Sequence, residues 1–223
     1  MKRLFDVRYE RGLSYAEGVR LQEEAVRRLR AGPDGNGLLL CVEHAAVITF
    51  GRSARREHLL AHADELQRRG ISLEDSSRGG DVTVHGPGQV TLYPVFPLDW
   101  FGRDLHRHMR RLEEVGAAYL AGHGLCAGRE VSDAPRTGVW VGDRKIAAIG
   151  IAVRGWVVFH GLGMNVQTDL SLFDLIVPCG IADRGVTTLA RETGKAYDMD
   201  CEMRRLTAAF FRVFDGAEPA SGN

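Results

Sequence analysis

Tight glycine turns between short β-rich runs constrain the fold of this chain more than any other feature. Turns at residues 86–88, 142–143 and 154–155 separate predicted strands, which with two earlier runs cover residues 38–42, 47–50, 82–84, 90–96, 139–141, 145–153 and 156–160. Gly-Pro-Gly and Gly-Asp favour chain reversal and short hairpin connections. Hairpins outnumber βαβ crossovers, so the pattern predicts an α+β fold with a mixed, mostly antiparallel sheet rather than a doubly wound sheet.

Several segments carry helix signals and are expected to surround this sheet. Ser14 followed three residues later by Glu17 is a capping box, which predicts the start of a first helix. Apolar residues at helical spacing predict further helices over residues 105–119 and 203–214. A helix is also expected over residues 57–69, because a glycine follows it.

Length and composition indicate one globular domain. A chain of 223 residues supports one substantial core, so we expect a single domain over residues 1–223 with a loose tail over residues 216–223. Lys+Arg and Asp+Glu are equal at 29 each, which argues against a general binder of nucleic acid or anionic membranes. No apolar run reaches the about 18 to 20 residues that span a bilayer. We therefore expect a cytoplasmic protein. We also expect it to act as a monomer.

The cysteines do not suggest a disulfide framework or a metal site. They are Cys41, Cys126, Cys179 and Cys201. They are far apart and form no C-x-x-C pair, so each is expected to be a free thiol. His58 and His62 lie four residues apart but have no apparent third ligand, and no metal is expected there.

Cys179 and Lys145 are the candidate catalytic pair. Cys179 lies in the turn-forming sequence Pro178-Cys179-Gly180, and Lys145 precedes it by 34 residues at the start of a predicted strand. A thiol with a pKa of about 8.5 is only a few per cent ionised at neutral pH, and a nearby ammonium group favours the reactive thiolate. Spacing alone equally allows a solvated lysine and an incidental turn cysteine.

Glycine-rich segments elsewhere indicate close approach of the backbone to a ligand. Arg78-Gly79-Gly80 is followed by Thr83 and His85, which combines small residues with hydrogen-bonding groups. No Gly-Lys-Ser/Thr follows, so this is not a P-loop. The sequence at residues 160–163, His-Gly-Leu-Gly, is similar in character. From composition alone, ordinary glycine turns with hydrogen-bonded histidines remain an alternative for both segments.

Two groups of arginines are candidates for docking a partner protein. Residues 103–111 form a basic stretch, and Arg52, Arg55 and Arg56 form a second cluster. Such runs are usually solvated surface. In a chain without net charge they are nevertheless the natural docking place for an acidic partner.

Taken in order along the chain, these motifs resemble the lipoyl(octanoyl) transferase family of the lipoate biosynthesis protein B type, over about residues 38 to 190. The resemblance implies a fold similar to the catalytic domain of biotin and lipoate protein ligases. It implies that Cys179 is the acyl-thioester nucleophile and that Lys145 lowers its pKa. The substrate-binding residues it implies are Arg78, Gly79, Gly80, Asp81, Val82, Thr83, Val84, His85, Ala148, Ile149, Gly150, Gly161, Leu162 and Gly163.

The family activity is transfer of an octanoyl group, without a cofactor, in the first step of lipoate biosynthesis. The implied donor is octanoyl-acyl carrier protein, and the implied acceptors are lysines of lipoyl domains of 2-oxoacid dehydrogenases and of the glycine cleavage H protein. Val84, Val158 and Gly163 depart from the family pattern, and we expect them to affect acyl chain length. Two alternatives stay open: an ATP-dependent lipoate or biotin ligase, and a noncatalytic acyl-carrier-binding module.

Overall fold

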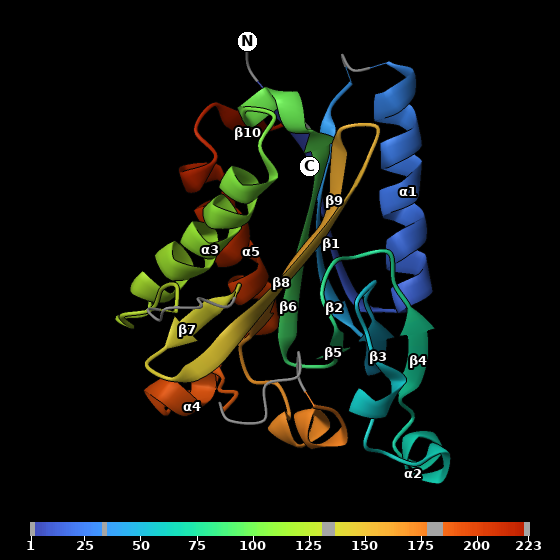
Figure 1. The fold of residues 1–223 in the computed structure, drawn as a ribbon. Coiled ribbons are helices and arrows are strands. Elements are labelled where there is room, and N and C mark those ends of the chain that lie inside the picture. Colours follow the sequence, from blue (N-terminus) through green and yellow to red (C-terminus); the bar gives the residue numbers. More distant parts are fainter. Residues whose placement is uncertain (1–2, 33–34, 131–136, 178–184, 221–223) are drawn as a thin grey trace.

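A seven-stranded sheet forms the middle of the molecule and has helices on both faces (Figure 1). The computed structural model of the chain describes residues 3–32, 35–130, 137–177 and 185–220. Helix α1 (Tyr15–Ala31) covers one face, where it contacts three strands of the sheet. Helices α3 (Leu105–Ala121) and α5 (Met199–Val213) pack together over the other face, and a short helix α4 (Leu189–Thr193) precedes α5.

The strand order of this sheet is β10-β1-β2-β6-β9-β8-β7. The strands are β1 (Arg3–Leu13), β2 (Gly37–His44), β6 (Gln89–Pro97), β7 (Val139–Val141), β8 (Arg144–Arg154), β9 (Val157–Asn165) and β10 (Ala217–Pro219). Strand β1 pairs in parallel with β2 and β10, whereas every pair from β2 to β7 is antiparallel. The predicted mixed, mostly antiparallel sheet is confirmed.

The predicted starts of α1 and α3 are confirmed by their caps, whereas α5 begins at Met199, earlier than the expected residue 203. The Ser14 side chain accepts a hydrogen bond from the backbone N–H of Glu17 at the start of α1. At the start of α3, the Asp104 carboxylate accepts from the N–H groups of His106 and Arg107. These bonds satisfy N–H groups that the first helical turn leaves without a partner, so each cap fixes where its helix begins.

A three-stranded sheet, in the order β4-β3-β5, forms a second layer of structure below the large sheet in Figure 1. Its strands are β3 (Val47–Phe50), β4 (Ser72–Asp75) and β5 (Val82–His85). The continuous helix expected over residues 57–69 is wrong: a 3-10 turn, η1 (Arg56–His58), is separated from the short helix α2 (Ala63–Arg68). The reason is tertiary, because Leu59 bridges to Ile176 and Leu60 donates its N–H to the Leu175 carbonyl.

The sequence signals miss the strands at one edge of the large sheet. Strand β1 carries several charged residues, and only Phe5 among its residues is buried, so it lacks the apolar alternation of an inner strand. The tail expected over residues 216–223 is partly ordered, because β10 pairs with β1 through Arg3 and Ala217. Neither strand has a local turn signal that would have revealed the pairing.

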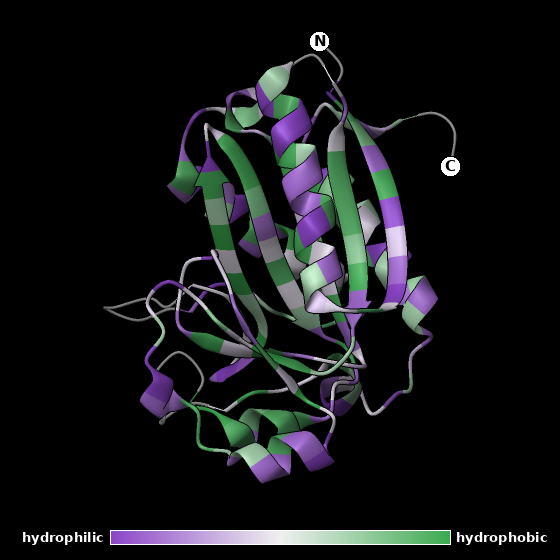
Figure 2. Cartoon of the chain, turned by 90° about the vertical axis from the view of Figure 1, so that its right-hand side faces the viewer, coloured by the Kyte–Doolittle hydropathy of each residue, from purple (hydrophilic) through white to green (hydrophobic). Residues whose placement is uncertain are grey.

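Each layer has its own apolar core. The largest lies between the sheet and helices α3 and α5, and includes η2 (Leu98–Phe101); a second lies under α1; a third joins the small sheet to η3 (Leu170–Leu175). Figure 2, with α1 in front, shows the helix presenting hydrophilic residues outward while the strands behind it are mainly hydrophobic or neutral. Among the described residues, no helix is long and apolar enough to cross a membrane.

His108 is an unusual member of the largest core. Its ring packs against Phe96 and Phe214, and neither ring nitrogen has a hydrogen-bond partner among the described residues. Burial lowers the pKa of His108 to about 3, so the ring is neutral near pH 7. An unpartnered buried polar group is unfavourable by about 1 to 3 kcal/mol. His108 therefore destabilises the core that contains it.

We predict that His108→Leu raises the free energy of unfolding at pH 7 by about 1 kcal/mol, because leucine fills a similar volume without polar atoms. The folded-state pKa lies below the unfolded value, so the unfolded state takes up a proton as pH falls from about 6.5 towards 3, and stability is lost in that window. The variant should lose less stability there. Urea denaturation at pH 7 and pH 4.5 measures both effects, with the exposed His106→Leu as the control. A less stable His108→Leu at both pH values would contradict the interpretation.

Candidate active site

Residues from all three sequence-predicted substrate segments line one narrow slot beside β8 and β9. Its walls are Tyr15, Arg78, Gly79, Gly80, Thr83, His85, Thr91, Tyr93, Ala148, Ile149, Gly150, His160, Gly161, Leu162 and Gly163. Three predicted residues lie elsewhere. Val82 and Val84 are buried in the core of the small sheet, and Asp81 faces the neighbouring cleft.

Arg78 anchors the first of these segments to the small sheet. Its guanidinium donates to both the carbonyl and the hydroxyl oxygen of Thr49, at 2.8 Å each, and to the Gly79 carbonyl. The Gly79 N–H in turn donates to the Ile151 carbonyl of β8. A Cβ at Gly150 would lie 3.0 Å from the Gly79 oxygen and 3.1 Å from the Arg78 side chain, so glycine at this position permits the close approach.

Neutral histidines and hydroxyl groups add polar atoms to a slot whose lining is mostly apolar. His85 hydrogen-bonds to Gln89, and His160 hydrogen-bonds to Ser77. Burial lowers the pKa of each histidine to about 3, and the charges of neighbouring groups, including Arg78, act in the same direction. Both rings are therefore uncharged near pH 7. The slot offers hydrogen bonds without presenting a histidine cation to a bound chain.

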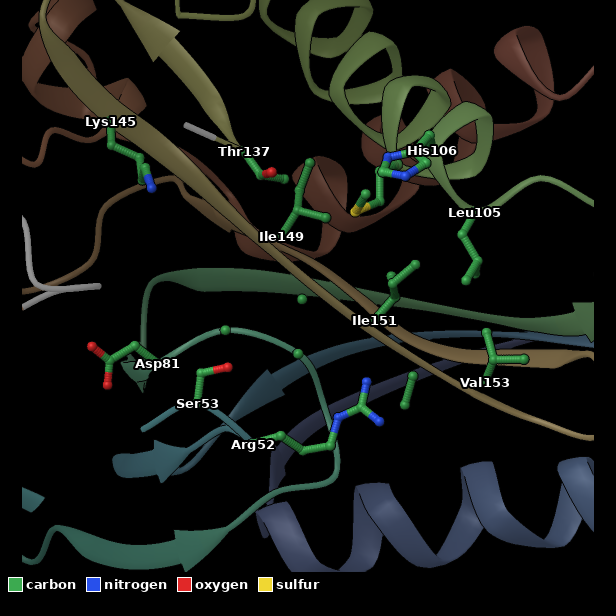
Figure 3. Close-up of a pocket in the computed structure, with 15 residues that line it drawn as sticks. Arg52, Ser53, Asp81, Leu105, His106, Thr137, Lys145, Ile149, Ile151 and Val153 are labelled. Carbon is green, nitrogen blue, oxygen red and sulfur yellow. The ribbon is translucent and has the colours of Figure 1, made fainter. Parts of the chain in front are cut away.

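A larger open cleft, with a volume of about 840 Å³, adjoins the slot along β8 (Figure 3). It shares Gly79, Gly80, Ile149 and Gly150 with the slot. Ile149, Ile151 and Val153 form an apolar side of the cleft, and Figure 3 shows Leu105 and His106 on one wall and Arg52 and Ser53 on the other. Lys145 lies at one end of this cleft.

Lys145 is held by its neighbours on β7 and by a later segment of the chain. Its ammonium nitrogen lies 4.8 Å from the centre of the Trp140 ring, within range of a cation–π interaction. Its backbone N–H donates to the Gly185 carbonyl, and its carbonyl accepts from the Thr187 N–H. Lys145, the predicted partner of Cys179, is therefore fixed at one end of the cleft rather than solvated on a free strand end.

Cys179 lies outside the described residues. The described chain before it ends at Val177, whose N–H donates to the His58 carbonyl, and His58 hydrogen-bonds to Asp81 of the cleft. The described chain after it begins at Gly185, which is bonded to Lys145. Both flanks of the segment that contains Cys179 are thus attached to residues of the candidate site.

Among the remaining cysteines, Cys41 is fully buried and burial raises the pKa of its thiol to about 12, which makes it unreactive near neutral pH. Cys126 and Cys201 are exposed. Among the described residues, no group of three or more His, Cys, Asp or Glu side chains is arranged to hold a metal ion.

Sequence reasoning missed several residues of the slot and the cleft. Tyr15, Thr91 and Tyr93 line the slot, and Leu105 and Met109 line the cleft. Tyr15 and Met109 lie in predicted helices, and no local motif marks a helical residue that faces a ligand. Their roles follow from which strands and helices become neighbours.

Most of the basic stretch over residues 103–111 serves the fold. Arg110 pairs with the buried Glu113, and Arg111 donates to the Phe101 carbonyl. Arg103 stacks on the Trp156 ring, with its guanidinium carbon 3.9 Å from the ring centre. From the second predicted cluster, Arg52 lines the cleft.

Known proteins resemble this chain over most of its length. The model of the family described as the lipoyl protein ligase A/B catalytic domain matches residues 14–211. A protein named octanoyltransferase from Chloroflexus aggregans is 46% identical over 206 residues, covering 91% of each chain. Another from Rubrobacter xylanophilus is 46% identical over 212 residues, covering 93% of each chain.

A solved structure agrees with the fold. The lipoate protein ligase of Thermoplasma acidophilum superimposes with a TM-score of 0.74 at 17% identity, covering 100% of this chain and 87% of that one. At this identity the likeness shows the fold alone. It confirms the predicted fold, similar to that of lipoate protein ligases.

We predict that Gly161→Ala and Gly163→Ala differ sharply in stability, although both glycines line the slot on β9. A Cβ at Gly161 would collide with the Leu92 carbonyl and lie 2.9 Å from Pro94, both on strand β6. A Cβ at Gly163 would meet the Gln89 side chain at 3.1 Å, which a small side-chain movement relieves. Gly161→Ala should therefore lose about 2 to 3 kcal/mol of unfolding free energy and Gly163→Ala less than about 1. Urea denaturation tests this, and equal losses would contradict it.

Proposed function

Because the chain belongs to the lipoyl protein ligase A/B catalytic domain family and is an acyltransferase of the octanoyltransferase type, we propose that it moves an octanoyl group from octanoyl-acyl carrier protein to a protein lysine. The proposed acceptors are lipoyl domains of 2-oxoacid dehydrogenases and the glycine cleavage H protein, in the first step of lipoate biosynthesis. The observation that supports this most is the convergence of the three substrate segments on one slot beside the cleft of Lys145.

In the first half of the proposed reaction, Cys179 is a thiolate and Lys145 its ammonium partner. The thiolate attacks the thioester carbonyl of the donor, forming a new carbon–sulfur bond and a tetrahedral intermediate. Collapse of the intermediate breaks the bond to the carrier thiol. The departing sulfur takes a proton from Lys145, which leaves a neutral amine at Lys145 and an octanoyl thioester on Cys179.

In the second half, the neutral amine of the target lysine attacks the Cys179 thioester. A carbon–nitrogen bond forms, and the bond to the Cys179 sulfur breaks. The proton that the attacking nitrogen loses goes to the neutral amine of Lys145. The pair returns to thiolate and ammonium, so one lysine serves as acid in the first half and as base in the second without an outside cofactor.

The slot is the proposed site of the octanoyl chain. Gly150, Gly161 and Gly163 place no side chains in it, and its histidines are neutral near pH 7. Of the three positions that depart from the family pattern, only Gly163 lines the slot. Val84 is buried in the core of the small sheet and Val158 in the core beneath α3 and α5, so acyl chain length should depend on Gly163 alone among them.

The two alternatives are less well supported. The relatives that cover most of the chain are named octanoyltransferases, whereas the ligase structure agrees in fold at 17% identity. A noncatalytic carrier-binding module has no use for a lysine anchored at the cleft and bonded to the segment that follows Cys179.

We predict that the protein gains the mass of one octanoyl group when it is mixed with octanoyl-acyl carrier protein, and loses it when an apo lipoyl domain is added, both without ATP. Intact-mass spectrometry follows both steps. Cys179→Ala should abolish the added mass while its circular dichroism spectrum stays that of the folded protein. The matched control Cys201→Ser, at an exposed thiol, should acylate normally.

The same experiment separates the proposal from its alternatives. A strict need for ATP would indicate a ligase, and binding of the carrier protein without any acyl transfer would indicate a noncatalytic module. Acylation that persists in Cys179→Ala would place the nucleophile on another residue.

We also predict that Arg52→Ala raises the KM for octanoyl-acyl carrier protein about fivefold and leaves kcat nearly unchanged. Arg52 lies on the wall of the cleft, where its charge attracts an acidic carrier as it approaches. The control is Arg27→Ala on the exposed side of α1. Steady-state kinetics at low and high salt measure the effect, which should shrink as salt rises. An equal KM in both variants would remove Arg52 from the docking surface.

A further inference from the structure

The backbone of Lys145 depends on a short segment that follows the Cys179 region. Gly185 accepts the Lys145 N–H at 2.9 Å, and the Thr187 N–H donates to the Lys145 carbonyl at 3.0 Å. The segment 185–187 therefore runs parallel to β8 and forms a single β-bridge with it, between Val186 and Lys145. This segment and the pairing with Trp140 of β7 together hold the backbone of Lys145.

Two buried contacts hold Thr187 itself, which is fully buried. Its carbonyl accepts a hydrogen bond of 3.2 Å from the Asn165 side chain at the end of β9. Its hydroxyl donates to Glu192. The Glu192 carboxylate also accepts from Nε and from one terminal nitrogen, Nη2, of Arg144, the residue before Lys145. The segment is thus fastened from the slot side by Asn165 and from the outer side by Glu192.

The hydrogen-bonded network continues from Asn165 to Gln89, which lies beside the slot. The direction of each hydrogen bond follows from which atoms can donate. The Thr187 carbonyl can only accept, so the Asn165 amide nitrogen faces it and the Asn165 oxygen accepts from Gln89 at 2.9 Å. The Gln89 nitrogen also donates to the Val84 carbonyl. The Gln89 oxygen must then accept from Nδ1 of His85, at 2.6 Å.

This network connects a residue of the slot to the backbone of Lys145 through buried groups. Gln89 and Asn165 are each 3% exposed, so solvent cannot replace their hydrogen bonds freely. An unpartnered buried carbonyl or amide is unfavourable by about 1 to 3 kcal/mol. Loss of Asn165 would leave the Thr187 carbonyl and the Gln89 amide without these partners, and the segment 185–187 would relax.

We propose that Asn165 is a positioning residue for Lys145, acting through Thr187, and that Gln89 joins this support to the acyl slot. The proposal rests on the role of Lys145 in the proposed function. The attraction between an ammonium and a thiolate falls as their separation grows, so a displaced Lys145 stabilises the Cys179 thiolate less. Among the described residues, the charged or titratable groups around Lys145 include Arg144, Glu192, Asp81, Arg52 and His58, and the substitution leaves them in place.

The test is Asn165→Leu, which keeps the size of the side chain and removes its hydrogen bonds to Thr187, Gln89 and Thr168. The rate at which iodoacetamide alkylates Cys179 is measured against pH, with the modified peptide identified by mass spectrometry. The midpoint should rise by about one pH unit relative to the wild-type protein. Octanoyl transfer should show kcat reduced about tenfold, with the KM for the donor changed less than twofold.

The matched control is Gln22→Leu. Gln22 is also a fully buried amide, and it bonds to the Gly18 carbonyl and to the His160 N–H but not to the segment 185–187. The Gln22→Leu variant should lose about as much unfolding free energy as Asn165→Leu and keep the wild-type midpoint for alkylation of Cys179. A second variant, Gln89→Met, removes the next link and should raise the midpoint by a smaller amount, which keeps the test available if Asn165→Leu does not fold.

An unchanged midpoint in both Asn165→Leu and Gln89→Met would overturn the proposal, as would an equal rise in Gln22→Leu. Failure of the proposed function looks different. In that case the wild-type protein itself would show an ordinary thiol midpoint at Cys179 and no acyl-enzyme by intact mass.

Discussion

The hydrogen bond from the Gly79 N–H to the Ile151 carbonyl is the contact on which the candidate site depends. It ties the loop of the small sheet to strand β8 of the large sheet, and the slot and the cleft lie on either side of that junction. The approach is close enough that a side chain at Gly150 would be crowded by Arg78 and Gly79. Arg78, fastened to Thr49, holds the loop in place, and the bonds from Ser77 to His160 and from Gln89 to Val84 add further contacts between the two sheets.

Much of the fold could be predicted because its signals are local. Ser14 and Glu17 mark the start of α1, and the glycine turn at residues 142–143 marks a hairpin. The errors occur where distant contacts decide. The bridge between Leu59 and Ile176 interrupts the helix expected over residues 57–69, and β10 is a strand only because β1 lies beside it. Nothing within a few residues of either position reports such a partner.

The candidate site divides in the same way. The glycine-rich segments are recognisable in the sequence, because close backbone approach requires particular residues at particular positions. The direction of each side chain is not, since Val84 and His85 are adjacent yet one enters the core of the small sheet and the other the slot. Likewise Arg110 resembles a docking residue until the buried Glu113 is found beside it. Strand alternation and tertiary neighbours decide which way each side chain points. A sequence motif carries no information about those neighbours.

The pairing of β1 with β10 has a consequence for how the protein is made. Arg3 and Ala217 become neighbours although they are far apart in the sequence, so this edge of the large sheet closes only after residue 217 has been synthesised. Contacts of such long sequence separation slow folding, because a long loop must close before they form. Until then residues 3–5 of β1 lack the partner that β10 provides, and an unpaired strand edge invites association between nascent chains. The charged residues along β1 oppose that association during synthesis.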